Sequence, residues 1–307
     1  MARVQHRSSW SGSWDSLPPG SPIHDMALRD GAPGQDRITR VGFHHFGADS
    51  APTLLLVHGA DTTWERSFSR AIPLLSRHFH VVAYGMSGFD STEDTTFRNA
   101  RAEAERIIGF IDSELDGMLT CLYAHSLGCQ TATYVAHHER VLTTILDGAV
   151  YANTGSFTPA MARLEEPLAR FLASDTLRKI ASFTGLPVLS GGVSDAIYLG
   201  ASRQSYRNTA WSNLAWSADL HTLEPRPQAR VHLWWGERER RAVRPTQRLM
   251  TRIFPSLQSK EFRGFSHGDL CARHPELLTQ EITVVARSHT ESGPQDQSAQ
   301  VDHSPGR

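Results

Sequence analysis

Residues 119–128, with the sequence LTCLYAHSLG, decide the fold. The first six form an apolar run that predicts a buried strand, and a helical pattern follows the glycine. Ser126 therefore lies in a tight strand-to-helix turn that lifts its hydroxyl clear of the sheet. Strand and helix pass close together there, so the residues two before and two after the serine must be small. Gly128 meets this condition, and Ala124 adds only one methyl group. The turn predicts a nucleophilic serine.

Further apolar runs of strand length lie on both sides of this turn. They cover residues 53–57, 79–84, 141–146, 231–235 and, more weakly, 257–262. Helical patterns separate them, such as the stripe formed by Ile107, Ile108, Ile111 and Leu115. Alternation of strands and helices predicts an α/β fold, in which helices flank both faces of a mostly parallel, doubly wound sheet.

The chain divides into four parts. Residues 151–225 contain no clear strand but have apolar residues at helical spacing, so we interpret them as a helical cap inserted into a core of residues 23–150 and 226–288. A continuation of the core is the alternative. The ends, residues 1–22 and 289–307, have too little apolar surface to offset the entropy cost of ordering, which predicts disordered tails.

Composition excludes several classes of protein. Of the 307 residues, 39% are apolar and 21% charged, as in ordinary globular proteins, and the net charge of −1 gives no basic field for nucleic acid or anionic lipid. No apolar run approaches the roughly 20 residues that span a membrane, and residues 1–14 lack the apolar core of a secretory signal. Three cysteines, a small and odd number, indicate free thiols in a reducing compartment, so we expect a cytoplasmic protein. We also expect it to be a monomer or a homodimer.

A second turn follows the strand predicted for residues 53–57. Gly59 lets the backbone bend sharply after this strand, which leaves the N–H of Ala60 free to point into a pocket. The N–H of Leu127 lies at the start of the helix after Ser126. These two backbone groups form the predicted oxyanion hole. We interpret His58 as structural rather than catalytic.

The motifs together resemble those of the α/β-hydrolase superfamily. They are His-Gly at residues 58–59, Ala-His-Ser-Leu-Gly at 124–128, Trp-Gly-Glu-Arg-Glu at 235–239 and Gly-Phe-Ser-His-Gly at 264–268. The similarity runs from about residue 23 to residue 288. It implies an α/β-hydrolase fold with a nucleophile, an acid and a base in that order along the chain.

The resemblance implies that His267 is the general base. It follows the last predicted strand and opens the last helix, where the family places its histidine. An imidazole with an unperturbed pKa of about 6.5 can accept and return a proton at neutral pH. The chain has sixteen histidines, so its position in the pattern distinguishes this one.

The acid has three candidates. Glu239 occupies the position where the family normally has an aspartate, and its carboxylate would orient the imidazole of His267. Asp147, at the end of the strand predicted for residues 141–146, occupies an alternative position for the acid in this family. Glu237 is the third candidate, and we favour Glu239. Another departure from the family is Gly85, which stands where an aspartate is frequent.

The resemblance implies hydrolysis of a carboxylic ester, lactone or thioester through an acyl-enzyme on Ser126. No Cys/His spacing matches a zinc site and there is no glycine-rich phosphate loop, so we expect neither a metal nor a cofactor. The substrate would be a small molecule. Some aromatic residues of the predicted cap could line an apolar pocket for it: Phe157, Phe171, Phe183, Tyr198, Tyr206, Trp211 and Trp216.

Two alternatives remain open. Relatives with a similar triad hydrolyse carbon–carbon bonds, act as lyases or act as cofactor-free peroxidases, and the fold does not choose among these reactions. Other proteins with this fold bind ligands without significant turnover. The serine at position 126 disfavours epoxide hydrolases and haloalkane dehalogenases, which have an aspartate there.

Overall fold

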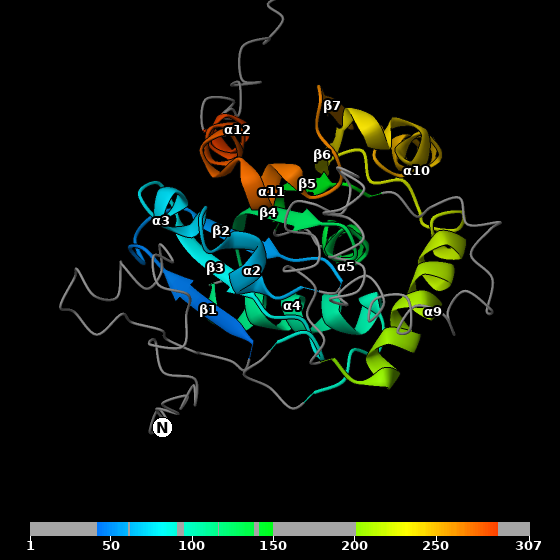
Figure 1. Ribbon diagram of the computed structural model, residues 1–307, viewed down its shortest axis with the longest axis horizontal. Helices are drawn as coiled ribbons and strands as arrows, with labels where there is room; N and C mark the ends of the chain where they lie inside the picture. The colour runs from blue at the N-terminus through cyan, green and yellow to red at the C-terminus, as the bar shows by residue number, and fades with distance from the viewer. Residues whose placement is uncertain are drawn as a thin grey trace, which may run out of the picture.

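The computed structural model consists of a twisted sheet with helices on both faces (Figure 1). It describes residues 42–60, 62–90, 95–115, 117–137, 141–149 and 201–287. The tails predicted for residues 1–22 and 289–307 lie outside the described residues, as does most of the cap predicted for residues 151–225.

Seven strands form the sheet in the order β1-β3-β2-β4-β5-β6-β7. Their bounds are β1 Phe43–Phe46, β2 Thr53–Val57, β3 His80–Tyr84, β4 Leu119–His125, β5 Val141–Asp147, β6 Arg230–Gly236 and β7 Gln258–Phe262. Strands β1 and β3 are antiparallel, whereas each other neighbouring pair is parallel. The prediction of a mostly parallel α/β sheet is confirmed.

The predicted strands match β2 to β7 to within a residue at either end, but β1 was missed. Its sequence, FHHF, is short and half of it is histidine, which disguises a buried strand. The structure accommodates both imidazoles through polar partners. Nε2 of His44 lies 3.2 Å from Asp90 Oδ2, and Nδ1 of His45 lies 3.0 Å from Nε2 of His80 on β3.

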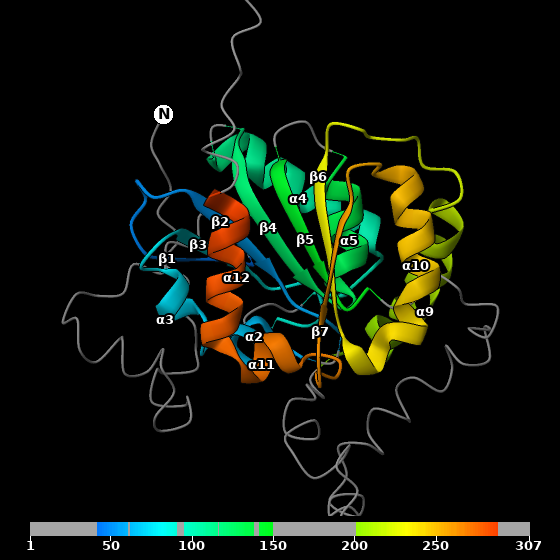
Figure 2. The ribbon, with the colours of Figure 1, turned by 90° about the horizontal axis from the view of Figure 1, so that it is seen from above.

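Helices cover the two faces of the sheet in two groups (Figure 2). One face packs against α4 Ala100–Glu114, α5 Gly128–Val135, α9 Arg203–Asp219 and α10 Arg240–Ile253. The other packs against α2 Trp64–Phe68, α3 Ile72–Leu75, α11 Asp269–Arg273 and α12 Pro275–Arg287. The short 3-10 helix η2, Glu237–Glu239, connects β6 to α10. Each face therefore buries one hydrophobic cluster.

Helix α9 lies within the segment predicted as a cap and packs directly on the core. Ser205 Oγ accepts a hydrogen bond from the N–H of Phe97 at 3.2 Å, and Ser212 Oγ accepts one from the N–H of Ala100 at 3.0 Å. Trp216 and Tyr206 of the same helix are each 1% exposed. The division into core and cap remains a prediction, since most of the segment lies outside the described residues.

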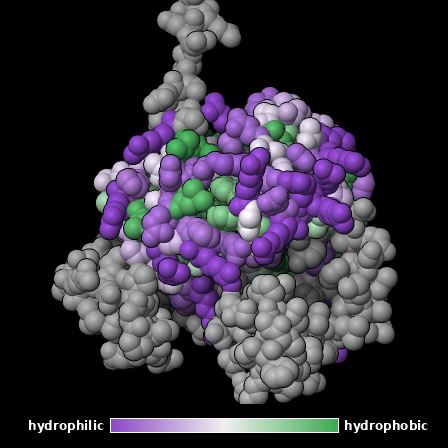
Figure 3. Space-filling model, turned by 45° about the horizontal axis from the view of Figure 1, so that its top comes forward, coloured by the Kyte–Doolittle hydropathy of each residue, from purple (hydrophilic) through white to green (hydrophobic). Residues whose placement is uncertain are grey.

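The described surface in Figure 3 is mainly hydrophilic, with hydrophobic residues gathered in small groups near the centre of the view. Three large hydrophobic side chains are strongly exposed among the described residues: Met118, Trp211 and Val284. Within the described part of the chain, no helix has the length and apolar character required to cross a membrane.

We expect Leu122→Ala to lower the free energy of unfolding by about 2–5 kcal/mol, because Leu122 is fully buried on the central strand β4 and its truncation leaves a cavity. Denaturant unfolding measures this loss. Met118→Ala is the control, since Met118 precedes the same strand and is 51% exposed, so its loss should stay below about 1 kcal/mol. Equal losses in the two variants would contradict the assignment of Leu122 to the core.

Candidate active site

Ser126 lies at the turn between β4 and α5 in a strained backbone conformation. Its φ is 54°, and it is the one non-glycine residue with positive φ in the part of the chain that the structure describes. Its N–H donates to Asp147 O at 2.9 Å, and its carbonyl accepts from the N–H of Cys129 at 2.9 Å. These bonds hold the turn in a region that L-residues seldom adopt. The strain is the one expected of a serine on a sharp strand-to-helix turn.

Close packing explains why small residues flank the serine. A Cβ added to Gly128 would lie 2.6 Å from the carbonyl oxygen of His58, so α5 approaches the end of β2 with no room for a side chain. A Cβ on Gly59 would lie 2.9 Å from Cβ of Ser126. The turn after β2 therefore packs directly against the serine.

His267 connects Ser126 to Glu239. It lies in the loop between β7 and α11. Its Nδ1 is 2.5 Å from Glu239 Oε1, and its Nε2 is 2.9 Å from Ser126 Oγ. The nitrogen that faces a carboxylate carries the proton, so Nδ1–H donates to Glu239. Nε2 is then left to accept a hydrogen bond from the hydroxyl of Ser126.

The short helix η2 turns the Glu239 side chain back toward the end of β6. Glu239 is buried, and its Oε2 accepts a hydrogen bond from the N–H of Gly236 at 2.9 Å. Both carboxylate oxygens are therefore engaged, one by the backbone and one by His267. The tight turn thereby accommodates the length of the glutamate side chain between Gly236 and His267.

The other two candidate acids lie near the site but bond elsewhere. Asp147 Oδ2 accepts a hydrogen bond from the hydroxyl of Tyr123 at 2.6 Å and lies 3.5 Å from His125 Nδ1. Glu237 Oε2 accepts from the N–H of Gly264 at 2.9 Å, which anchors the loop before His267. Of the three carboxylates, Glu239 is the one that the structure brings into hydrogen-bond contact with the imidazole.

Electrostatics around His267 favour its charged form. Desolvation of the ring opposes protonation, but the hydrogen bond from Nδ1 to Glu239 and the negative charge of that carboxylate outweigh it and raise the pKa of His267. The charge of Asp147 acts in the same direction. These interactions therefore stabilise the imidazolium form of His267.

His58 fixes the orientation of the peptide between Gly59 and Ala60. Its Nε2 lies 3.1 Å from the N–H of Met86, which can only donate, so Nδ1 carries the proton and donates to Gly59 O at 2.8 Å. In a trans peptide the carbonyl and the N–H point in opposite directions. The N–H of Ala60 therefore points away from the His58 ring. Burial lowers the pKa of His58 to about 4, so the ring stays neutral.

Sequence reasoning missed several polar residues of this region. The carboxylate of Asp90 fills the space beside Gly85, since a Cβ on that glycine would lie 1.9 Å from Asp90 Oδ2. Tyr123 was interpreted only as part of an apolar strand and His125 only as part of the Ala-His-Ser-Leu-Gly motif, yet both face Asp147. The sequence offered one signal for them. An ionisable or hydroxyl-bearing side chain in a strand buried on both faces needs a polar partner.

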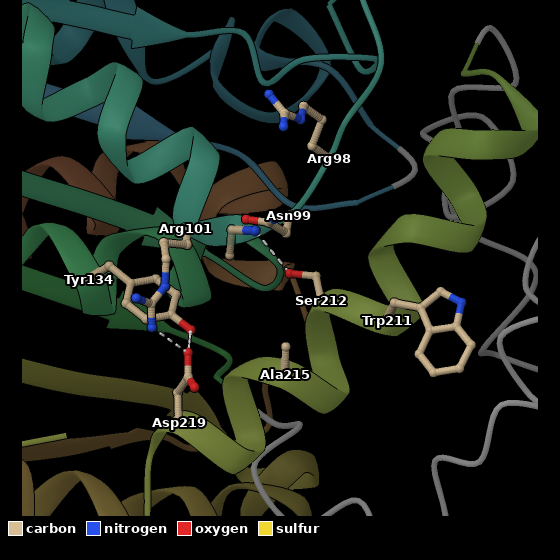
Figure 4. Close-up of a pocket in the computed structure, with 9 residues that line it drawn as sticks. Arg98, Asn99, Arg101, Tyr134, Trp211, Ser212, Ala215 and Asp219 are labelled. Carbon is tan, nitrogen blue, oxygen red and sulfur yellow. Dashed lines mark hydrogen bonds and ion pairs between the residues drawn. The ribbon is translucent and has the colours of Figure 1, made fainter. Parts of the chain in front are cut away.

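A separate cavity of about 290 Å³ opens between α4, α5 and α9 (Figure 4). Arg101 and Tyr134 both point at Asp219, at 2.9 and 2.6 Å from its Oδ2, so these polar groups satisfy one another. Trp211 points away from this cluster and is 52% exposed. The lining includes neither Ser126 nor His267. Of the aromatic residues proposed for a substrate pocket, Phe157, Phe171, Phe183 and Tyr198 lie outside the described residues.

A sequence model of the alpha/beta hydrolase family matches residues 54–287, which is most of the chain. The chain belongs to this family. The match confirms the resemblance that the motifs around Ser126 and His267 indicated.

Solved structures share the fold. A family protein from Desulfitobacterium hafniense superposes with a TM-score of 0.67 at 20% identity, over 79% of this chain and 99% of that one. An enol-lactonase from Burkholderia xenovorans gives a TM-score of 0.59 at 17% identity, over 80% of this chain and 95% of that one. An uncharacterized hydrolase of Saccharomyces cerevisiae is 36% identical over 71 residues, but these span only 23% of this chain and 22% of the yeast protein.

We expect the neutral, buried His58 to make stability depend on pH. In the unfolded chain His58 binds a proton below about pH 6.5, whereas in the folded protein it does so only near pH 4. The free energy of unfolding should therefore fall by up to about 3 kcal/mol on this account as the pH drops from 6.5 to 4.

The measurement is denaturant unfolding at several pH values for the wild type and for His58→Asn, which keeps a donor near Gly59 O but cannot titrate. Between pH 6.5 and 4, the free energy of unfolding should fall less in His58→Asn than in the wild type, by up to about 3 kcal/mol. His78→Asn, which removes an exposed histidine, should decline like the wild type. Identical pH dependence in all three proteins would contradict the expectation for His58.

Proposed function

We propose that this protein is a serine hydrolase that cleaves a carboxylic ester, lactone or thioester of a hydrophobic small molecule. One observation carries the proposal: Ser126 Oγ, both ring nitrogens of His267 and Glu239 Oε1 form an unbroken hydrogen-bonded chain, with separations of 2.9 and 2.5 Å. A nucleophile, a base and an orienting carboxylate in this geometry can carry out acyl transfer.

In the first half of the reaction, Nε2 of His267 removes the hydroxyl proton of Ser126 as Oγ attacks the substrate carbonyl carbon. The carbonyl π bond breaks and its electron pair moves to oxygen. Glu239 stabilises the imidazolium without taking its proton. The tetrahedral intermediate then collapses, the bond to the leaving group breaks, and the imidazolium protonates the leaving alkoxide or thiolate.

The N–H groups of Ala60 and Leu127 would stabilise the oxyanion. Leu127 precedes α5, so its N–H belongs to the positive end of that helix. The hydrogen bond between His58 and Gly59 O sets the direction of the Ala60 N–H, and the turn at Gly59 lies against Ser126. Donors that are fixed before the reaction stabilise the developing charge without reorganisation.

In the second half, His267 takes a proton from water as the water oxygen attacks the acyl carbon. Collapse of this second tetrahedral intermediate breaks the bond to Ser126 Oγ, and the imidazolium returns a proton to the serine. The free acid leaves and the enzyme is regenerated. Every proton in this scheme moves through Nε2, the ring nitrogen beside Ser126.

Family membership supports hydrolysis in general, and ester or lactone chemistry is the finer proposal. An enol-lactonase is among the proteins that share this fold, and such an enzyme cleaves a bond between an acyl group and oxygen. A hydrophobic substrate is proposed from the number of aromatic residues in the sequence of the predicted cap.

Ser126 should react with a serine-directed fluorophosphonate. One label per chain is expected, and peptide mass spectrometry should locate it on Ser126, because His267 activates this hydroxyl. Ser87, another serine buried in the fold, should remain unlabelled and serves as the internal control. Equal labelling of Ser126→Ala and the wild type would refute the proposed nucleophile.

Glu239→Gln should lower kcat by several powers of ten, on the order of 10⁴ in the serine protease precedent, because the imidazole loses its orienting charge. Steady-state kinetics with an ester probe, after circular dichroism has confirmed folding, measures the effect. Glu237→Gln is the matched control, since it makes the same change two residues away, and its loss should be far smaller. A folded Asp147→Asn that loses more activity than Glu239→Gln would move the acid to β5.

A further inference from the structure

We infer that His125, Asp147 and Cys271 form a binding site for a thiophilic divalent cation such as Zn²⁺ beside the proposed catalytic histidine. We further infer that its occupancy inhibits the enzyme. The inhibitory part rests on the proposed function, whereas cation binding does not. The site is distinct from the chain formed by Ser126, His267 and Glu239.

The three side chains converge from separate elements. His125 ends β4, Asp147 ends β5 and Cys271 lies on α11. One ligand atom from each, a ring nitrogen, a carboxylate oxygen and Sγ, lies within 4.8 Å of the other two, and all three residues are buried. Nitrogen, oxygen and sulfur donors together match the preference of Zn²⁺, whereas Mg²⁺ and Ca²⁺ prefer oxygen alone.

The imidazole of His125 provides an unused donor. Its Nδ1 is buried and has no hydrogen-bond partner among the described residues. It faces Asp147 Oδ2 at 3.5 Å. Buried ring nitrogens are normally satisfied, and a lone pair directed at a carboxylate is unfavourable unless a proton or a cation lies between them. A metal ion between Nδ1 and Oδ2 would satisfy both atoms.

Charge balance favours a divalent ion. Asp147 contributes one negative charge, His125 binds as neutral imidazole, and Cys271 contributes a second negative charge after its thiol proton leaves to solvent. The two negative charges of the ligands cancel the +2 charge of the bound ion. Burial raises the pKa of the Cys271 thiol, so without a cation it stays protonated and donates weakly to Gly268 O at 3.4 Å. Metal coordination deprotonates such a thiol.

The spacing suits tetrahedral coordination after small side-chain adjustments. Zinc bonds of about 2.0–2.3 Å place two ligand atoms roughly 3.3–3.6 Å apart, which the 3.5 Å between His125 Nδ1 and Asp147 Oδ2 already meets. Sγ of Cys271, which lies within 4.8 Å of the other ligand atoms, would move closer to them. The hydroxyl of Tyr123, 2.6 Å from Asp147 Oδ2, supplies the outer hydrogen bond that orients a metal-binding carboxylate.

Binding would disturb His267. The rings of His125 and His267 have centroids 4.7 Å apart. A divalent ion held by His125 and Asp147 would place positive charge beside the His267 ring, which takes the proton of Ser126 in the proposed mechanism. Proton transfer from Ser126 would become less favourable, so kcat would fall.

Cobalt(II) is the direct probe of the site. Titration of the full chain with Co²⁺ should produce a sulfur-to-metal charge-transfer absorption band, which Zn²⁺ should abolish by displacement. Cys271→Ala should lose the band. Cys121→Ala, which removes another buried thiol, should keep it and is the matched control. Absence of the band in the wild type, or its persistence in Cys271→Ala, would overturn the site.

Inhibition is measured separately with the ester probe. The Zn²⁺ concentration for half-inhibition should rise at least tenfold in Asp147→Asn relative to the wild type, and less than twofold in Cys121→Ala. Asp147→Asn also tests the site in the Co²⁺ titration if Cys271→Ala does not fold. Equal Zn²⁺ sensitivity in all variants would place the inhibitory ion elsewhere. A Co²⁺ band in a protein without esterase activity would uphold the site and refute the proposed function.

Discussion

The close approach of α5 to the end of β2 is the constraint on which the site depends. Gly128 leaves no space for a side chain against His58 O, and Ser126, two residues earlier in the same turn, has a positive φ. The strain is maintained by hydrogen bonds from β5 and α5. Without that packing the serine could relax, and its hydroxyl would no longer lie 2.9 Å from Nε2 of His267.

The parallel direction of the strands brings the other residues of the site together. Strands β2, β4, β5, β6 and β7 run in the same direction, so the turns at their carboxyl ends meet along one edge of the sheet. Ser126 and His267 are 141 positions apart in the chain and still share a hydrogen bond. The hydrophobic clusters on the two faces fix the strands and thereby the positions of these turns.

The sequence was most informative where one physical requirement dominates. Continuous apolar runs revealed β2 to β5 because a strand covered on both faces has no polar side. The FHHF strand escaped because its histidines are satisfied by Asp90 and His80, residues that only the fold brings close. The sequence favoured Glu239 over Asp147 by its position in the Trp-Gly-Glu-Arg-Glu motif, but the contact of Glu239 with His267 depends on how far η2 turns the glutamate back.

Clusters assembled from distant residues are the hardest to foresee. His125, Asp147 and Cys271 share no spacing that identifies a metal site, because one strand end, a neighbouring strand end and a short helix supply them. Predicting such a group requires the register of β4 against β5, in which His125 pairs with Asp147, together with the position of α11. Neither can be derived from local periodicity.

The hydrogen bond from Gly236 to Glu239 has a consequence for the motion of the side chain. A glutamate has one more rotatable bond than an aspartate and can adopt more conformations in solution. Oε2 is tied to the backbone of the residue that begins the turn, and Oε1 is tied to the imidazole, so rotation about the last bond is blocked at both ends. The Glu239 side chain is therefore held in one conformation, and the entropy cost of ordering it arises during folding, before any substrate binds.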